Sequence, residues 1–357
     1  MHILTFQTEN FRNLARAEMN PCAGVNVIFG ENGQGKTSLL EAIWLFTGCR
    51  SFRSADAAEL VMENQAQAKL QTSFISNERE QHAALEIAKR RVLTLNGFAE
   101  ETPRRMLGVF PAVAFTPDTL SLVKGGPGER RRFLDVALSM LTPAYAVRLS
   151  KYLKALAQRN ALLRQPRPSE ELLDTWDAAL AREAAGLLAA RLRYLEELIP
   201  RAKDFYEKIS AAREALDIAP HITGIEEPTE AAYLAAFLRA RPNDLRRQMT
   251  TIGPHRDDLR LSLNGRALRD FGSQGQQRSA ALALKLAEAA TLGDIAREAP
   301  VALLDDVLSE LDARRQADLL RYLEGWQVFL TCCEPSHALH GRAGRVFHVK
   351  NGEVTAG

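Results

Sequence analysis

The sequence predicts an α/β protein in which both ends of the chain form one unit of strands and helices. Three observations predict this arrangement. Short apolar strands occur near both ends, residues from about 129 to 216 have helical periodicity, and an apolar strand leads into a glycine-rich loop and a helix. We expect residues 1–128 and 251–357 to build this unit, and residues 129–250 to be a mainly helical insertion.

The first elements are predicted from alternation and from apolar runs. Leu4 and Phe6 alternate with polar residues and residues 25–29 are an apolar run, so the first thirty residues are expected to form a strand, a turn and a strand. A helix is expected from about Thr37 to Phe46. Its buried side would contain Leu39, Leu40, Ile43 and Trp44.

The next elements are predicted to be a set of antiparallel strands. Residues 68–95 alternate between apolar and polar, and they end at Asn96-Gly97, a dipeptide typical of tight hairpins. Residues 111–128 are rich in proline and glycine, and we expect loops around residues 113–115.

The middle of the chain is predicted to be helical. Two apolar stripes have helical spacing, and residues 165–169 separate them. Pro200 is expected to kink or restart the second helix. The stripes consist of Tyr145, Leu149, Tyr152 and Leu156, and of Leu188, Leu192, Leu195 and Ile199. The alternative of a long coiled coil is weaker, because both stripes are short and interrupted.

Strand character returns towards the C-terminus. A strand over residues 259–263 precedes Asn264-Gly265, a second hairpin dipeptide. Two further strands are expected at 301–304 and 327–331. A last hairpin is expected at 346–354.

Composition indicates an ordinary soluble globular protein. The chain has 357 residues, of which 46% are hydrophobic and 25% charged, and its net charge of +2 does not by itself indicate nucleic acid binding. Four cysteines without a CxxC spacing favour reduced thiols in the cytoplasm over a disulfide framework or a zinc site. The first residues do not resemble a signal peptide, and no run of eighteen apolar residues suggests a membrane span.

The most specific motif is a phosphate-binding loop. The segment Gly30-Glu31-Asn32-Gly33-Gln34-Gly35-Lys36-Thr37 fits G-x-x-x-x-G-K-[ST] between a strand and a helix, the context that this motif requires. Its glycines allow backbone N–H groups to surround a phosphate at the helix N-terminus. Ser38, the next residue of that helix, is expected to belong to the same binding site. Lys36 would reach the β- and γ-phosphates, and Thr37 would bind Mg²⁺. The alternative is a glycine turn that caps a helix.

A second motif supplies carboxylates. Residues 301–304 are apolar and lead into Asp305 and Asp306, so a buried strand would deliver two acids to its carboxyl end. Asp305 would hold Mg²⁺, and Asp306 would orient the attacking water. Alternatively, either residue could be a helix N-cap.

A third motif is the segment FGSQGQQRSAALAL at residues 271–284. Its amide-rich beginning suggests a loop, and Ala280, Leu284 and Ala287 form one stripe of a following helix. Ser273-Gln274-Gly275-Gln276 resembles the S-x-G-Q signature of ATP-binding-cassette ATPases. That resemblance implies that Ser273, Gly275 and Gln276 cover the γ-phosphate bound by a second copy, with a helix starting near Arg278 directed at it. Alone, the segment could be only a turn and a cap.

Taken in order, several segments resemble the RecF family of bacterial recombination and replication proteins. They are LTFQTENFRNL, GENGQGKTSLLEAIW, GGPGERRRFLD, IGPHRDDL, GSQGQQRS and LLDDVLSELD, and they cover the chain to about Thr331. The resemblance implies a P-loop ABC-ATPase head, a mixed sheet with flanking helices, related to the heads of SMC proteins. It also implies a weak, DNA-stimulated, cytoplasmic ATPase that dimerises with ATP. Its partners would be duplex and gapped DNA, RecR with RecO and, indirectly, RecA.

Three positions depart from the cassette pattern. Asp306 is one methylene shorter than the usual Glu, so we expect slow hydrolysis. Cys332 or Cys333 stands near the place of the usual switch His. No Gln occurs around residues 115–117, where the glutamine that couples the two lobes would lie.

DNA contact is predicted from local basic clusters. The clusters are Lys89, Arg90 and Arg91; Arg130, Arg131 and Arg132; Arg241, Arg246 and Arg247; and Arg50 with Arg53. Backbone phosphate binding requires such cations, although each cluster alone could be a solvated surface. Arg130–Arg132 could instead lie near the nucleotide. His255 and Arg256 are expected to be core or hinge residues, with contact to the site as the alternative.

Two other classes of function compete with this one. The nucleotide-binding subunit of a membrane transporter would have a shorter spacing between Lys36 and Ser273. A structural protein of the chromosome, with little ATP turnover, would fit the slow hydrolysis expected of Asp306.

Overall fold

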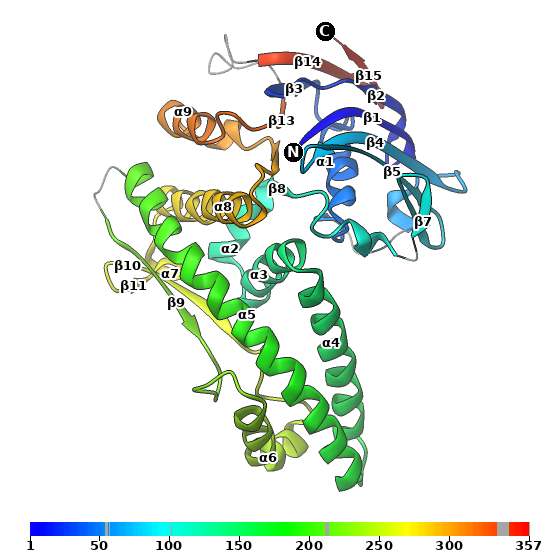
Figure 1. The fold of residues 1–357 in the computed structure, drawn as a ribbon. Helices are drawn as coiled ribbons and strands as arrows, with labels where there is room; N and C mark the ends of the chain where they lie inside the picture. The colour runs from blue at the N-terminus through cyan, green and yellow to red at the C-terminus, as the bar shows by residue number, and fades with distance from the viewer. Residues whose placement is uncertain (54–55, 57, 101, 211–213, 334–342, 357) are drawn as a thin grey trace. The chain divides into compact units, whose positions relative to one another are not determined.

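The computed structural model describes residues 1–53, 56, 58–100, 102–210, 214–333 and 343–356. The chain separates into two compact units (Figure 1). Unit 1 contains residues 1–119 and 285–357, and unit 2 contains residues 120–284.

Unit 1 is built on a mixed sheet, as the sequence predicts. Among the described residues its strand order is β7-β6-β5-β4-β1-β2-β15-β14-β3-β13-β12-β8. The strands are β1 (His2–Phe11), β2 (Leu14–Met19), β3 (Val25–Phe29), β4 (Ala68–Ser76), β5 (Arg79–Ile87), β6 (Arg91–Leu95), β7 (Phe98–Glu100), β8 (Ala112–Phe115), β12 (Val301–Asp305), β13 (Val328–Cys332), β14 (Ala343–Lys350) and β15 (Glu353–Ala356). The run from β8 to β14 is parallel, and the pairs from β7 to β2 are antiparallel.

The parallel part of the sheet explains the continuous apolar runs. Every residue of β12 and β13 is buried, as expected for strands covered on both faces. Strand β3, which leads into the phosphate-binding loop, pairs with β13 on one side and β14 on the other. The expectation of loops around residues 113–115 does not include a strand there, but residues 112–115 form the buried strand β8.

Helices complete unit 1. Helix α1 (Lys36–Trp44) follows the loop and α9 (Ala313–Tyr322) follows β12. Helix α8 (Gln274–Ala296) contains the boundary between the units, and its predicted stripe is buried at Ala280, Leu284 and Ala287. Short 3-10 helices occur at Leu45–Thr47, Ala58–Leu60, Pro103–Met106, Pro117–Leu120 and Leu308–Glu310.

The predicted hairpins are confirmed, and their turns have the expected backbone. Asn96 and Gly97 have φ of 51° and 84°, and Asn264 and Gly265 have φ of 48° and 78°. Two consecutive left-handed residues match the twist of a two-residue hairpin, which is why Asn-Gly is favoured there.

The first thirty residues contain one strand more than predicted. The additional strand, β2, pairs with β1 in antiparallel register, with Met19 opposite Phe6. Its sequence LARAEM is rich in alanine and charged residues, which have low β propensity. Pairing with β1 and burial of Leu14, Ala17 and Met19 outweigh that local preference.

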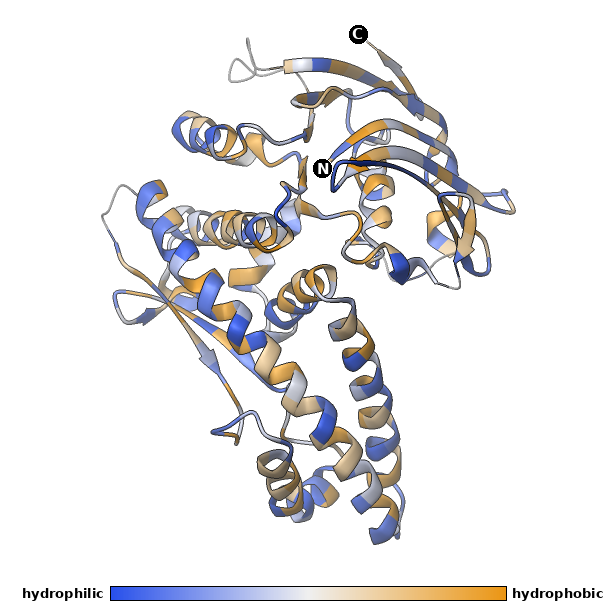
Figure 2. Cartoon of the chain, in the orientation of Figure 1, coloured by the Kyte–Doolittle hydropathy of each residue, from blue (hydrophilic) through white to orange (hydrophobic). Residues whose placement is uncertain are grey.

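Unit 2 is mainly helical. Its helices are α2 (Ser121–Lys124), α3 (Pro127–Leu141), α4 (Pro143–Leu163), α5 (Glu170–Ser210), α6 (Glu230–Arg247), α7 (Leu268–Phe271) and the first part of α8. Strands β9 (Leu216–His221), β10 (Asp258–Leu263) and β11 (Arg266–Ala267) form a second sheet. In Figure 2 hydrophilic and hydrophobic residues alternate along α4 and α5, as expected of helices with one buried side.

The expectation that Pro200 restarts the second helix is wrong, because α5 continues through it to Ser210. Proline lacks the N–H that would bond to the carbonyl of Glu196. Pro200 and Glu196 both lie on the exposed side of the helix, where water can replace the missing donor.

Among the described residues, no helix is both long enough and apolar enough to span a bilayer.

Candidate functional site

The predicted phosphate-binding loop has a backbone conformation that requires its glycines. Gly30, Gly33 and Gly35 have φ of 154°, 81° and 119°, in the range that residues with a side chain rarely adopt. A Cβ at Gly35 would lie 2.7 Å from the Cδ2 atom of Leu14. Gly35 is also the N-cap of α1, so the free N–H groups of that helix end at the loop.

Lys36 is held against the loop that it follows. Its ammonium donates hydrogen bonds to the carbonyl oxygens of Gly30 at 2.6 Å and Glu31 at 2.9 Å. The residue is only 7% exposed, although its charge lies at a cleft. This places a fixed cation where the motif requires one for phosphate.

Thr37 and Asp305 join two motifs that are 268 residues apart in the sequence. The Thr37 hydroxyl donates a 2.9 Å hydrogen bond to Asp305 Oδ1, which also accepts one of 2.9 Å from the Thr331 hydroxyl. Burial raises the pKa of Asp305, and these two hydrogen bonds oppose that rise. Hydroxyl and carboxylate oxygens at one point fit Mg²⁺, which prefers hard oxygen ligands.

Asp306 has a backbone conformation that explains its identity. Its φ is 51°, and its N–H donates to the Thr331 hydroxyl at 2.9 Å. Asp and Asn adopt the left-handed region more readily than longer side chains do. The local backbone therefore favours the short acid where cassette ATPases usually have Glu.

Residues of the phosphate-binding loop and of the acidic pair line one cleft of about 530 Å³, a volume typical of small-molecule sites. The described residues that line it all belong to unit 1. They are Arg12, Asn13, Asn32, Gly33, Gly35, Lys36, Thr37, Ser38, Arg53, Glu59, Val61, Pro117, Asp305, Asp306 and Thr331.

Two lining residues come from the turn between β1 and β2 and have no predicted role. The Asn13 amide donates to the Gly33 carbonyl at 2.9 Å and accepts from the Ser38 hydroxyl at 2.8 Å, so it braces the loop. Arg12 lies beside it with φ of 54°. Both residues stand in the segment LTFQTENFRNL, but their positions depend on contacts with residues 20 or more positions away.

The signature segment begins a helix earlier than predicted. Helix α8 starts at Gln274, so Gln274, Gly275 and Gln276 belong to its first turn and the expected start near Arg278 is wrong. Ser273 accepts from the Gln276 N–H at 3.2 Å, and the Gln276 side chain accepts from the Ser273 N–H at 2.6 Å. Ser273 and Gln274 are exposed, so this end of the helix is accessible in unit 2.

Of the two adjacent cysteines, Cys333 lies near Lys36. Its Sγ is 3.9 Å from Lys36 Nζ and 3.1 Å from Asn32 Oδ1. Cys332 is buried, and burial raises the pKa of its thiol to about 11. Of the two residues expected near the place of the switch His, Cys333 is therefore the one that lies beside the loop.

The basic clusters differ in how their charges are used. Lys89 and Arg90 are exposed between β5 and β6, and Arg246 and Arg247 are exposed at the end of α6. Arg130 is buried and bonds both oxygens of Asp258, at 2.7 and 2.9 Å. The same guanidinium donates to two backbone carbonyls, so Arg130 joins α3 to β10 within unit 2.

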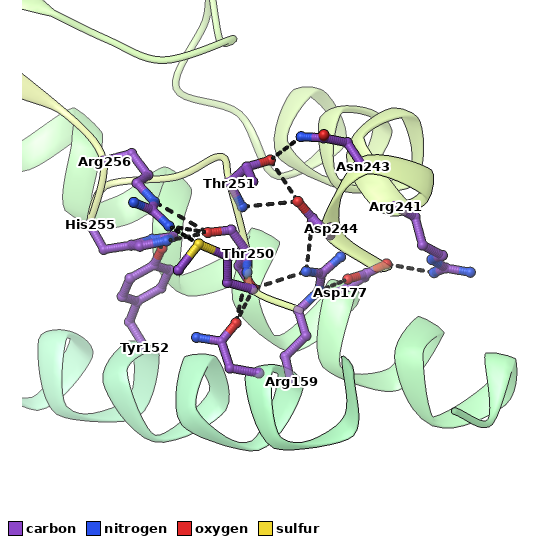
Figure 3. Close-up of polar contacts among 12 residues, drawn as sticks. Tyr152, Arg159, Asp177, Arg241, Asn243, Asp244, Thr250, Thr251, His255 and Arg256 are labelled. Atoms are coloured by element: carbon purple, nitrogen blue, oxygen red, sulfur yellow. Dashed lines mark hydrogen bonds and ion pairs between the residues drawn. The ribbon is translucent and has the colours of Figure 1, made fainter. Parts of the chain in front are cut away.

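Unit 2 contains a buried polar network around Arg159, shown in Figure 3. The Arg159 side chain has no exposed surface and bonds Asp177 at 2.5 Å and Asp244 at 2.7 Å. Arg241, from one of the predicted clusters, bonds the second oxygen of Asp177 at 2.5 Å. The network ties α4, α5 and α6 together.

His255 and Arg256 belong to the same network. The Tyr152 hydroxyl lies 2.5 Å from His255 Nδ1, and His255 Nε2 lies 3.1 Å from the Thr250 carbonyl (Figure 3). Arg256 donates to that carbonyl at 3.1 and 3.3 Å. Burial lowers the pKa of His255 to about 4, so the ring is neutral near pH 7. These contacts agree with the expectation of a structural role.

Comparison with known proteins gives matches over the whole chain. The RecF/RecN/SMC N-terminal domain family matches residues 2–354. A protein of Heliobacterium modesticaldum named DNA replication and repair protein RecF is 39% identical over 99% of both chains. A protein of the same name from Geobacter metallireducens is 39% identical over 99% of this chain and all of its own.

Solved structures agree with these matches. A structure described as the recombination mediator protein RecF with ATP, in the RecFOR pathway, has a TM-score of 0.91 and 34% identity, and covers 99% of this chain and 97% of its own. An SMC head bound to the winged-helix domain of ScpA has a TM-score of 0.58 at 17% identity, covers 100% of this chain and 97% of its own, and shows a shared fold.

Proposed function

The chain belongs to the RecF family, and from this premise we propose that it is an ATP-dependent DNA-binding protein of recombinational repair and replication. One observation carries the proposal. Lys36, Thr37 and Asp305 meet at one cleft, although Thr37 and Asp305 are 268 residues apart in the sequence. The relatives that match 99% of this chain are named DNA replication and repair proteins, which disfavours the alternative of a transporter subunit.

In this proposal the loop from Gly30 to Ser38 binds the phosphates of ATP. The N–H groups at the start of α1 and the Lys36 ammonium would neutralise their charge. Thr37 and Asp305 would hold Mg²⁺, which when bound neutralises negative charge on the phosphates. Asp306 would orient the attacking water. Its short side chain supports a weak ATPase.

The signature segment would act on a second copy. Ser273 already accepts one hydrogen bond from its own helix, and its O–H remains able to donate to a phosphate. The N-terminus of α8 adds partial positive charge at the same point. Two copies, each with ATP, would therefore form a dimer in which Ser273, Gly275 and Gln276 contact the nucleotide of the partner.

DNA would bind through exposed cations. Lys89, Arg90, Arg246 and Arg247 are exposed, whereas Arg130 is fully used inside unit 2. Contacts of this kind go to backbone phosphates, so we expect affinity for duplex and gapped DNA to fall steeply with salt. We propose that the protein acts in the cytoplasm with RecR and RecO and thereby assists RecA.

Sedimentation of the purified chain tests this function. We expect a monomer without nucleotide, a dimer with ATP and Mg²⁺, and a heavier complex when duplex DNA is added. Ser273→Arg should still bind ATP but remain monomeric, and Lys36→Ala should lose ATP binding. A dimer that forms without ATP and survives Ser273→Arg would contradict the proposal.

A further inference from the structure

A buried carboxylate on α1 links the arginines of the nucleotide cleft. Glu41 follows Thr37 by four residues, so both lie on one side of the helix. Its side chain is completely buried, and a carboxylate in such a place requires partners. Thr37 is part of the cleft lining and Glu41 is not, so Glu41 lies behind the surface that a nucleotide would touch.

The firmest partner of Glu41 is Arg12. Arg12 Nε donates to one carboxylate oxygen at 3.0 Å, and Nη2 donates to the other at 2.8 Å. This two-bond arrangement fixes the plane of the guanidinium. Arg12 Nη1 is 3.8 Å from the exposed Glu59, the second acid within reach. Without Glu41, Arg12 would be drawn towards that exposed acid.

The second partner is the segment that carries Arg53. The buried Ser51 hydroxyl donates to Glu41 at 2.5 Å and accepts from the Arg53 N–H at 2.9 Å. Arg53 Nη1 is itself 3.6 Å from Glu41. One carboxylate therefore holds one arginine through its side chain and another through both its backbone and its charge.

Both arginines line the cleft that contains Lys36 and Thr37. Among the described lining residues they add two guanidinium groups to the Lys36 ammonium, and the same lining includes the acids Asp305, Asp306 and Glu59. A nucleoside triphosphate carries several negative charges, so the position of these cations affects its binding. An arginine turned towards Glu59 would lose that effect.

We propose that Glu41 is a positioning residue for ATP binding. It holds Arg12 and Arg53 towards the phosphates but does not itself contact the nucleotide. The inference rests on the proposed function of this cleft. It assigns to a residue of α1 a role beyond the phosphate-binding motif. Glu41 keeps both guanidinium groups in place before the nucleotide arrives, so that less conformational freedom is lost on binding.

Glu41→Gln tests the proposal, because it keeps the size of the side chain and removes its charge. We expect ATP affinity in Mg²⁺, measured by isothermal titration calorimetry, to fall about tenfold, the scale of a typical coupling energy. Glu63→Gln, at an exposed glutamate outside the cleft lining, is the matched control, and it should change the affinity less than twofold. Glu41→Asp should recover part of the loss.

A double-mutant cycle separates positioning from folding. If Glu41 acts through Arg12 and Arg53, Glu41→Gln should have little further effect in a chain that already carries Arg12→Gln and Arg53→Gln. A full additional loss in that chain, or wild-type affinity in Glu41→Gln, would overturn the inference. Failure of the wild-type chain to bind ATP would instead contradict the proposed function.

Loss of folded protein is monitored in the same samples. Thermal unfolding should show whether Glu41→Gln is folded at the temperature of the titration. If it is not, the single variants Arg12→Gln and Arg53→Gln decide. Each should weaken ATP binding severalfold, and wild-type affinity in both would overturn the inference.

Discussion

Ser273 and Gln276 bind each other's backbone N–H groups, and so form a reciprocal cap at the start of α8. The segment is therefore a helix cap whatever else it does. A cap and a phosphate contact differ in their tolerance of negative charge. Asp is as good an N-cap as Ser, but it would repel the phosphate of a partner.

The first prediction uses this difference. Ser273→Asp should keep the melting temperature of the wild type within about 2 °C and abolish the ATP-dependent dimer in sedimentation. Ser273→Ala should lose about 1 kcal/mol of stability because the cap is lost. A Ser273→Asp chain that dimerises normally would limit the segment to capping.

The second prediction concerns Asp306. Asp306→Asn keeps a residue that tolerates φ of 51° and removes the carboxylate. ATP binding should stay within about twofold, and steady-state hydrolysis should fall by roughly 100-fold, as expected when a general base is removed. Asp306→Glu should lower stability without restoring a fast ATPase, because the backbone disfavours the longer side chain. Faster hydrolysis in Asp306→Glu would argue against this explanation.

The third prediction concerns the thiol of Cys333. It is exposed and lies 3.9 Å from Lys36 Nζ, so a maleimide attached there should block ATP binding. Bound ATP should in turn slow the labelling, as followed by mass spectrometry. Cys49 and Cys332 serve as internal controls, since burial raises the pKa of each thiol to about 11 and makes it unreactive. Equal labelling with and without ATP would contradict the geometry.

The fourth prediction concerns Arg159. Arg159→Met leaves Asp177 and Asp244 buried without their shared cation, and should destabilise unit 2 by about 3–5 kcal/mol. Hydrogen exchange of peptides from α4 and α6 measures this loss locally. Arg164→Met, on the exposed end of α4, is the control and should change little. Unchanged protection in Arg159→Met would show that the network is not needed for stability.

The fifth prediction is a pH dependence from His255. Its pKa is lowered to about 4 by burial, while an unfolded His has a pKa near 6.5. Between these values the unfolded chain binds the additional proton, so stability falls as the pH decreases through this window. The groups that modulate this pKa besides burial are the Thr250 carbonyl, Arg256, Arg131 and Asp244.

Comparison with His255→Gln isolates this contribution. The variant lacks the titrating ring, so its loss of stability between pH 7.5 and pH 5 should be smaller than that of the wild type by about 2 kcal/mol. Urea unfolding at the two pH values measures both losses. Parallel losses in the two chains would mean that His255 is not neutral and buried.

The sequence predicts best what depends on neighbouring residues. Glycines, an apolar strand and a helix specify the phosphate-binding loop locally, and Asn-Gly specifies both hairpins through two left-handed residues. The wrong predictions occur where distant contacts or water outweigh local preference. Strand β2 depends on its pairing with β1, and α5 passes through Pro200 because the missing hydrogen bond faces solvent.

The candidate site follows the same division. Lys36, Thr37 and Asp305 are found from their motifs, and the structure brings them to one cleft. Arg12, Asn13 and Glu41 have no local pattern of their own. Their roles depend on side chains that meet only after β1, β2 and α1 are packed, so a single sequence contains no periodic signal for them.

The order of strands in the sheet has a consequence for synthesis on the ribosome. Strand β3 is made among the first thirty residues, but both strands that flank it, β13 and β14, are made among the last. Unit 2 is continuous in the chain and can fold while translation proceeds. The candidate nucleotide cleft, in contrast, can close only when translation is nearly finished, so a truncated chain should be unable to hold ATP.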